Sequence, residues 1–153
     1  MSESLSKSFS NLKVAAPHMK VQIALPKPSE DNRVLFYGFD VGTEWYIEYT
    51  NTHRKELKDF DELSKISAGI KLLRAHTGIK GLKLESALND PAAPTSTTMP
   101  GRPGEPRVPV LSIFSNEGPS YRRRPSQEQI DQLVQIMGRQ PRWWIDYDDP
   151  RSY

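Results

Sequence analysis

The chain has 153 residues, a mass of 17.4 kDa and a formal net charge of +2, and 36% of its residues are hydrophobic. This length fits one domain, and the small net charge favours a folded core over a wholly disordered chain. The sequence contains no cysteine, which excludes disulfides, thiolate metal sites and cysteine nucleophiles.

Residues 1–17 are rich in serine and have neither the apolar core of a signal peptide nor an Arg-rich amphipathic pattern. We interpret them as a flexible, mobile N-terminal tail ahead of a single domain over residues 18–153. No apolar run reaches the roughly 18 residues that a membrane span needs. The sequence therefore predicts a soluble intracellular protein of the cytoplasm or nucleus, with no membrane span.

Three strands are predicted before the first helix. Residues 21–25 alternate apolar with polar or small side chains, which indicates a half-buried strand, and residues 26–32 have the composition of a loop. Residues 34–40 and 44–49 are rich in aromatic and β-branched residues and flank Gly42. This pattern predicts a β-hairpin.

The first predicted helix begins at Asp59, an N-cap residue followed by Glu62 three positions later. Apolar side chains then recur at three- and four-residue spacing, which is typical of a buried helix face. These side chains are Phe60, Leu63, Ile66, Ile70 and Leu73. Gly78 is expected to end the helix, and the alternation in residues 79–84 predicts another strand.

Six prolines fall between residues 89 and 109. This density predicts a long flexible insertion, similar to polyproline, with no regular element. Residues 108–113 are predicted to form a short strand at the edge of the sheet, because Pro109 has no N–H to donate. Residues 115–125 are predicted to be a loop.

The second predicted helix begins with a capping box formed by Ser126 and Gln129. Its apolar stripe follows the ideal helical spacing, and Gly138 is expected to end it. The stripe consists of Ile130, Leu133, Val134 and Met137. Together the elements predict an α+β fold: a small antiparallel sheet of three to five strands packed with two helices, with the long Pro-rich insertion and the N-terminal tail.

The sequence assigns no catalytic, cofactor-binding or metal-binding residue. His18, His53 and His76 are not at metal-ligand spacing, and His53, although near Glu56 in the sequence, is interpreted as a solvated loop residue. Residues 101–104 contain two glycines but lack the lysine and the strand-to-helix setting of a phosphate loop. We therefore expect neither enzyme activity nor a bound cofactor.

Eight of the eleven arginines follow residue 100, where they are interleaved with aromatic residues. Arginine with exposed aromatic residues is typical of protein-interface hot spots, and the same combination contacts phosphates and stacks on bases. The predicted partner-binding residues are Arg122, Arg123, Arg124, Arg139, Arg142, Trp143, Trp144 and Tyr147. Adjacent tryptophans in an extended segment point to opposite sides, so we expect one to anchor in the core and the other to be exposed.

Ser126 follows two arginines and a proline, which fits a loose basophilic kinase pattern. Because Ser126 is also the predicted N-cap, a phosphate there would meet the positive end of the helix dipole and neighbouring arginines. Ser126 is therefore a candidate phosphorylation site.

Three predicted strands, followed by Asp59, Phe60 and Leu63, resemble the front half of a phox-homology (PX) domain, a family that binds membrane phosphoinositides. The resemblance covers residues 19–75. Where the family has a phosphate-binding arginine and a ring-stacking tyrosine, this chain has Glu56 and Leu57. The resemblance thus implies a shared outline of strands and helix and does not supply these headgroup contacts.

These observations favour a non-catalytic adaptor module that binds another protein through an Arg/Trp-rich C-terminal surface. The alternative is RNA or DNA binding through the same arginines and aromatic residues, although seven carboxylates after residue 100 leave that region with little net charge. A third interpretation is a phosphoinositide-binding, PX-like module. The sequence leaves the oligomeric state open.

Overall fold

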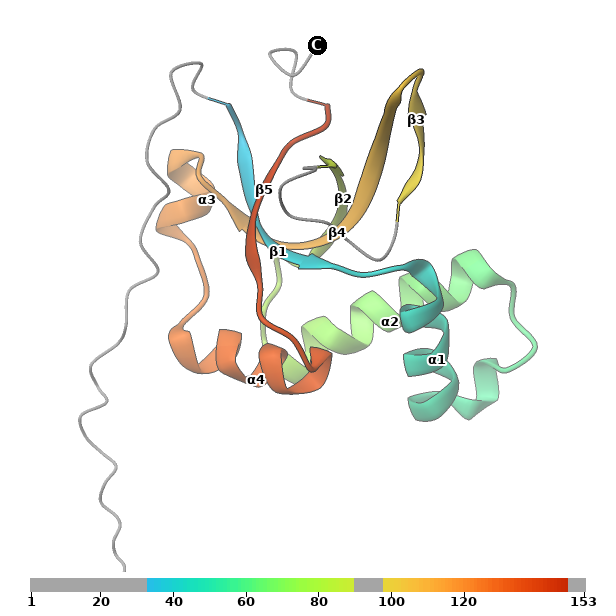
Figure 1. Ribbon diagram of the computed structural model, residues 1–153. Helices are drawn as coiled ribbons and strands as arrows, with labels where there is room; N and C mark the ends of the chain where they lie inside the picture. The colour runs from blue at the N-terminus through green and yellow to red at the C-terminus, as the bar shows by residue number, and fades with distance from the viewer. Residues whose placement is uncertain (1–32, 90–97, 149–153) are drawn as a thin grey trace, which may run out of the picture.

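A computed structural model describes residues 33–89 and 98–148 (Figure 1). The predicted tail and the predicted strand at residues 21–25 lie outside these ranges. The elements are β1 (Leu35–Asp40), α1 (Thr43–His53), the 3-10 turn η2 (Lys55–Leu57), α2 (Glu62–Thr77), β2 (Lys83–Leu88), β3 (Met99–Arg102), β4 (Glu105–Ser115), α3 (Gly118–Arg122), α4 (Gln127–Met137) and β5 (Arg142–Ile145).

The predicted α+β class with a small antiparallel sheet is confirmed. The sheet has five strands in the order β2-β4-β1-β5, with β3 paired to β4, and every pairing is antiparallel. Two helices were expected and the described residues form four, because α1 and α3 occupy segments predicted to be a strand and a loop. Within the described ranges, no helix is long and apolar enough to cross a membrane.

The sheet curls until its two edges meet. Strand β5 pairs with β1, and the residues just after β5 reach β2 at the opposite edge. Asp146 forms a bridge with Ala87, and the Tyr147 N–H donates to the Ser86 carbonyl oxygen at 2.9 Å. Both faces of β5 are consequently covered, one by the helices and one by the curled sheet.

Two apolar clusters hold the fold together. The larger lies between the sheet and the helices α1, α2 and α4, which Figure 1 shows on the same side of the sheet. Its fully buried members include Phe39, Tyr46, Leu73 and Leu111. The smaller cluster lies on the inner face of the curl and consists of Ala87, Val108, Val110 and Trp144.

The predicted hairpin is wrong in its second strand, because residues 44–49 belong to α1. The aromatic residues of this segment also fit a helical repeat: the rings of Trp45 and Tyr49 stack with their centroids 4.8 Å apart. Tyr46 is fully buried against α2, where Gly69 allows close approach, since a Cβ on Gly69 would lie 2.9 Å from the Tyr46 carbonyl oxygen. Packing against α2 therefore favours the helix over the strand.

The start of α2 differs from the prediction by two residues. Asp61, rather than Asp59, is the N-cap, and its carboxylate accepts from the Ser64 N–H at 2.8 Å. Gly78 ends the helix with a φ of 74°, as predicted.

The predicted apolar stripe of this helix is only partly buried. Ile70 and Leu73 lie in the core, whereas Phe60 is 54% and Leu63 is 80% exposed. The contacts of α1 with α2 include those at Lys65, Gly69 and His76, all beyond the first turn. Nothing in the described part of the chain therefore covers the first turn of α2 at Leu63.

The strands after α2 also differ from the prediction. The strand expected at residues 79–84 is β2, which begins at Lys83. The Pro-rich segment was expected to have no regular element, yet its last part forms the β3–β4 hairpin, which turns at Gly104 with a φ of 74°. The rest of that segment, residues 90–97, lies outside the described ranges.

Pro109 was expected to place its strand at an edge, but β4 is central and has neighbours on both sides. Proline lacks a donor and keeps its acceptor. The Pro109 carbonyl oxygen accepts from the Val41 N–H at 3.2 Å, so this position still joins β4 to the segment that follows β1.

Helix α4 agrees with the prediction at both ends. The Ser126 hydroxyl accepts from the Gln129 N–H at 3.2 Å, and the Gln129 Oε1 accepts from the Ser126 N–H at 3.0 Å. Gly138 ends the helix with a φ of 73°.

Candidate functional site

The two adjacent tryptophans lie on opposite faces of β5, as predicted, but the expected exposed tryptophan is wrong. Trp143 is half-buried in the larger cluster, with its ring centroid 5.1 Å from that of Tyr37. Trp144 is 3% exposed, and its Nε1–H donates to the Gly38 carbonyl oxygen at 3.0 Å. The curl of the sheet covers Trp144, and Trp143 is only partly exposed.

Three further predicted residues contact the strands. The Arg142 Cζ lies 3.4 Å from the centroid of the Trp144 ring. The Arg139 Nη1–H donates to the Asp40 carbonyl oxygen at 2.6 Å. Tyr147 is 6% exposed, and its hydroxyl accepts from the Arg102 N–H. Arg139 therefore joins the end of α4 to β1, Arg142 covers the Trp144 ring, and Tyr147 joins the end of β5 to β3.

The remaining predicted residues lie on and after α3. Arg122 and Arg123 are exposed. The Arg124 Cζ lies 4.2 Å from the centroid of the Tyr121 ring, and the Arg124 Nη1–H donates to the Tyr121 carbonyl oxygen at 3.0 Å. Ser126 is exposed at the start of α4, so its hydroxyl is accessible.

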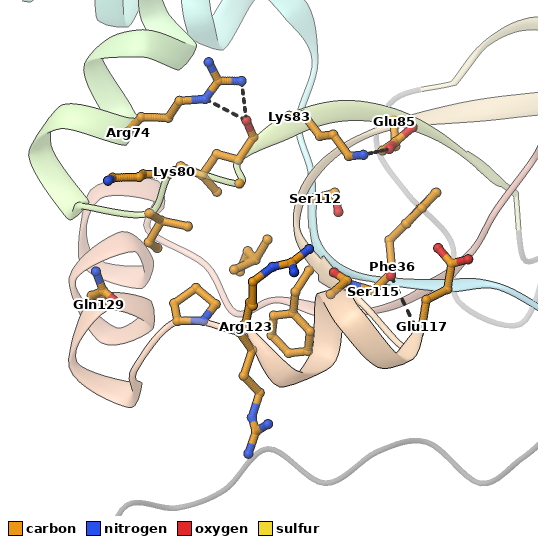
Figure 2. A pocket seen from close by; sticks show the side chains of 18 of the residues that line it. Phe36, Arg74, Lys80, Lys83, Glu85, Ser112, Ser115, Glu117, Arg123 and Gln129 are labelled. Carbon is orange, nitrogen blue, oxygen red and sulfur yellow. Dashed lines mark hydrogen bonds and ion pairs between the residues drawn. The ribbon is translucent and has the colours of Figure 1, made fainter.

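A cavity of about 1040 Å³ opens beside this arginine segment, between the α2–β2 turn, β4 and the start of α4. Figure 2 shows Lys80 on the side of Gln129, Glu85 and Glu117 on the other side, and Arg123 between them. Charged side chains of both signs therefore line the cavity.

Two of the basic side chains that line the cavity already interact with other groups of the protein. Both Nε and Nη2 of Arg74 donate to the Leu82 carbonyl oxygen, at 2.9 and 2.6 Å. The Lys83 Nζ lies 3.1 Å from the Glu85 Oε2. Within the part of the chain that the structure describes, the side chains of Lys80 and Arg123 have no such partner.

The serine hydroxyls that line the cavity hold the turn ahead of α3. The Ser115 N–H donates to the Ser120 Oγ at 2.9 Å, and the Glu117 N–H donates to the Ser115 Oγ at 3.3 Å. No histidine is among the described residues that line the cavity. The charged side chains of this lining can attract a charged ligand.

A second surface, which the sequence analysis missed, follows the outer face of α2. This groove of about 620 Å³, called the α2 groove below, is lined by Arg54, Leu57, Phe60, Leu63, Ser64, Ser67, Ala68, Lys71, Leu72 and Ala75. It holds two of the three large hydrophobic residues that are exposed in the described ranges. The apolar spacing of Phe60 and Leu63 is in the sequence, but it was interpreted as a buried stripe.

Comparisons with protein-family models, with curated proteins and with solved structures gave no match. The resemblance to the front half of a PX domain has no support from the structure, because residues 44–49 are helical where that outline requires a strand.

Proposed function

We propose that this protein is a non-catalytic interaction module that binds an amphipathic helix of a partner protein in the α2 groove. The observation that carries the proposal is the exposure of Leu63 (80%) and Phe60 (54%) at one end of a groove. Contiguous exposed apolar side chains of this size are typical of surfaces that bind another protein.

The shape of the groove fits a helix. Helix α2 has 16 residues, so its outer face is about 24 Å long. Small side chains at Ser64, Ala68 and Ala75 leave room beside the larger Leu63 and Leu72. A partner helix that lies along such a face contributes apolar side chains at i, i+4 and i+7.

The charges of the groove favour an acidic partner. Its lining contains Arg54 and Lys71 and no carboxylate, and Arg54 is paired with Glu56 beside the groove, so Lys71 carries the charge argument. Lys71 is exposed and has no ion-pair partner among the described residues. Complementary charge at the rim sets partner choice and association rate more than it sets affinity. We therefore specify the partner as a helix with an apolar face and acidic flanks.

The experiment uses a fluorescein-labelled amphipathic peptide of about 18 residues, with leucines on one face and glutamates on the flanks. A second peptide has lysines in place of the glutamates. We expect the full-length protein to bind the glutamate peptide more tightly by fluorescence anisotropy, and Lys71→Glu to reverse this preference. Leu84→Ala is the matched control, since Leu84 is an exposed leucine (38%) on β2, outside the groove lining.

Three results would overturn the proposal. The first is equal binding, or no binding, of both peptides. The second is a dimer that forms with increasing protein concentration in sedimentation experiments and that prevents peptide binding. In that case the groove would bind a second copy of this chain. The third is salt-sensitive binding of labelled RNA or DNA that depends on Arg122, Arg123 and Arg124 without peptide binding, which would support the nucleic-acid alternative.

A further inference from the structure

Two histidines that are distant in the sequence meet on the surface of the α1–α2 pair. His53 lies in the last turn of α1 and His76 in the last turn of α2. Their ring centroids are 5.5 Å apart, and both side chains are exposed. Neither lines the α2 groove, although each is next in sequence to a residue that does, Arg54 and Ala75.

One residue, Tyr49, contacts the Nδ1 atom of both histidines. The His53 Nδ1 is 3.0 Å from the Tyr49 carbonyl oxygen, and the His76 Nδ1 is 2.5 Å from the Tyr49 hydroxyl. A carbonyl can only accept, so the His53 Nδ1 carries the proton and Nε2 keeps the lone pair of the neutral ring. A phenol can accept as well as donate, so His76 can adopt the same arrangement.

We propose that His53 and His76 together bind a divalent transition-metal ion through their Nε2 atoms, with Cu²⁺ bound most tightly and Zn²⁺ and Ni²⁺ more weakly. Two imidazoles that share one tetrahedral ion at about 2.0–2.1 Å have ring centres roughly 5 Å apart, close to the spacing found here. Metal-binding histidines usually donate their other ring N–H to a neighbouring oxygen, and Tyr49 supplies that oxygen to both rings.

The ligand set defines which ions bind. Among the described residues, no group of three or more His, Cys, Asp or Glu side chains lies close enough to hold a metal. Within the described residues the two histidines are therefore the proposed protein ligands, and water would complete the coordination. Imidazole nitrogens suit copper, nickel and zinc, whereas Mg²⁺ and Ca²⁺ prefer oxygen ligands and are expected not to bind.

The chain offers sharp controls for this site. It has three histidines and no cysteine, so each candidate nitrogen ligand can be removed in turn. Trp45 stacks on Tyr49 with ring centroids 4.8 Å apart, so its fluorescence reports an ion bound beside Tyr49. His53 and His76 are exposed, so replacing either with glutamine is expected to leave the melting temperature unchanged.

The experiment titrates the full chain with Cu²⁺, Zn²⁺, Ni²⁺ and Mg²⁺, followed by tryptophan quenching for Cu²⁺ and by calorimetry for all four ions. We expect His53→Gln and His76→Gln each to weaken Cu²⁺ binding at least tenfold, and His18→Gln to have no effect. The double variant should be little worse than either single variant, because one ion needs both ligands. Binding should also weaken as the pH is lowered, because protons compete with the metal ion for the ring nitrogens.

Unchanged affinity in either single variant would overturn the proposal, as would an equal loss in His18→Gln. A second measurement needs no variant: bound Ni²⁺ should shift or broaden the imidazole resonances of His53 and His76 in the wild-type protein and leave those of His18 sharp. Equal broadening of all three would also overturn the proposal.

Discussion

Two leucines of α2 directly test which face of this helix is buried and which is exposed. Leu73 is completely buried and Leu63 is 80% exposed. Replacing the buried leucine with alanine should lower the free energy of unfolding by about 2–5 kcal/mol, because the change leaves a cavity. Full burial of a leucine side chain contributes about 1.5–3 kcal/mol, so Leu63→Ala, which removes about a fifth of that burial, should cost only about 0.3–0.6 kcal/mol.

The exposed surface of Leu63 also determines how much affinity for a partner helix the Leu63→Ala variant should lose. If a partner helix covers the remaining four fifths of Leu63, Leu63→Ala removes about 1.2–2.4 kcal/mol of binding free energy, or roughly 8- to 60-fold in affinity. Urea unfolding followed by circular dichroism measures stability, and anisotropy with the glutamate peptide measures binding. A loss of stability above about 2 kcal/mol in Leu63→Ala would refute the reasoning, because Leu63 would then be packed against the chain's own residues.

Further predictions concern three residues, Tyr46, Gly38 and Ser126. The buried Tyr46 hydroxyl has no partner among the described residues, so Tyr46→Phe should leave stability in urea unchanged or raise it. Burial also raises the pKa of the Tyr46 hydroxyl far above 10, and the positive charge of Arg139 partly opposes this shift. The tyrosine of the unfolded chain ionises at about pH 10, so the stability of the wild-type protein should fall as the pH rises beyond that value. The fall should be smaller in Tyr46→Phe. Gly38→Ala should cost more than about 3 kcal/mol in thermal unfolding, since its Cβ would lie 2.0 Å from the Leu111 carbonyl oxygen, and a near-native melting temperature would contradict this close approach. Ser126→Ala should lower the free energy of unfolding by about 1 kcal/mol, because the helix loses its cap. Ser126→Glu, as a mimic of phosphorylation, should raise stability or alter partner binding relative to Ser126→Ala. No change in stability or in binding would remove Ser126 as a regulatory site.

Features set by neighbouring residues could be predicted from the sequence. Ser126, Gln129 and Gly138 define both ends of α4 because a capping box and a left-handed glycine act within a few positions of the chain. The opposite orientations of Trp143 and Trp144 follow in the same way from the geometry of an extended strand.

Features set by distant residues could not be predicted. The helix at Trp45 and Tyr49 replaces a strand because α2 packs against it. Leu63 is exposed because α1 packs on later turns of α2. Trp144 is buried because β2 meets the end of β5. The α2 groove and the His53–His76 pair were missed for the same reason, since each depends on how α1 and α2 are arranged.

The strand order also determines when the sheet can form during synthesis. Strands β1 and β2 come first in the described chain, but they do not pair with each other, and each needs β4 as its neighbour. A nascent chain that has not yet reached Glu105 can form α1 and α2 but no pairing between β1 and β2. At about 5–20 residues per second, roughly 4–15 seconds separate the synthesis of β1 from the completion of β4. Through that interval β1 lacks the partner strands that the structure describes for it, β4 and β5, so its apolar residues are expected to be accessible to chaperones that bind extended segments.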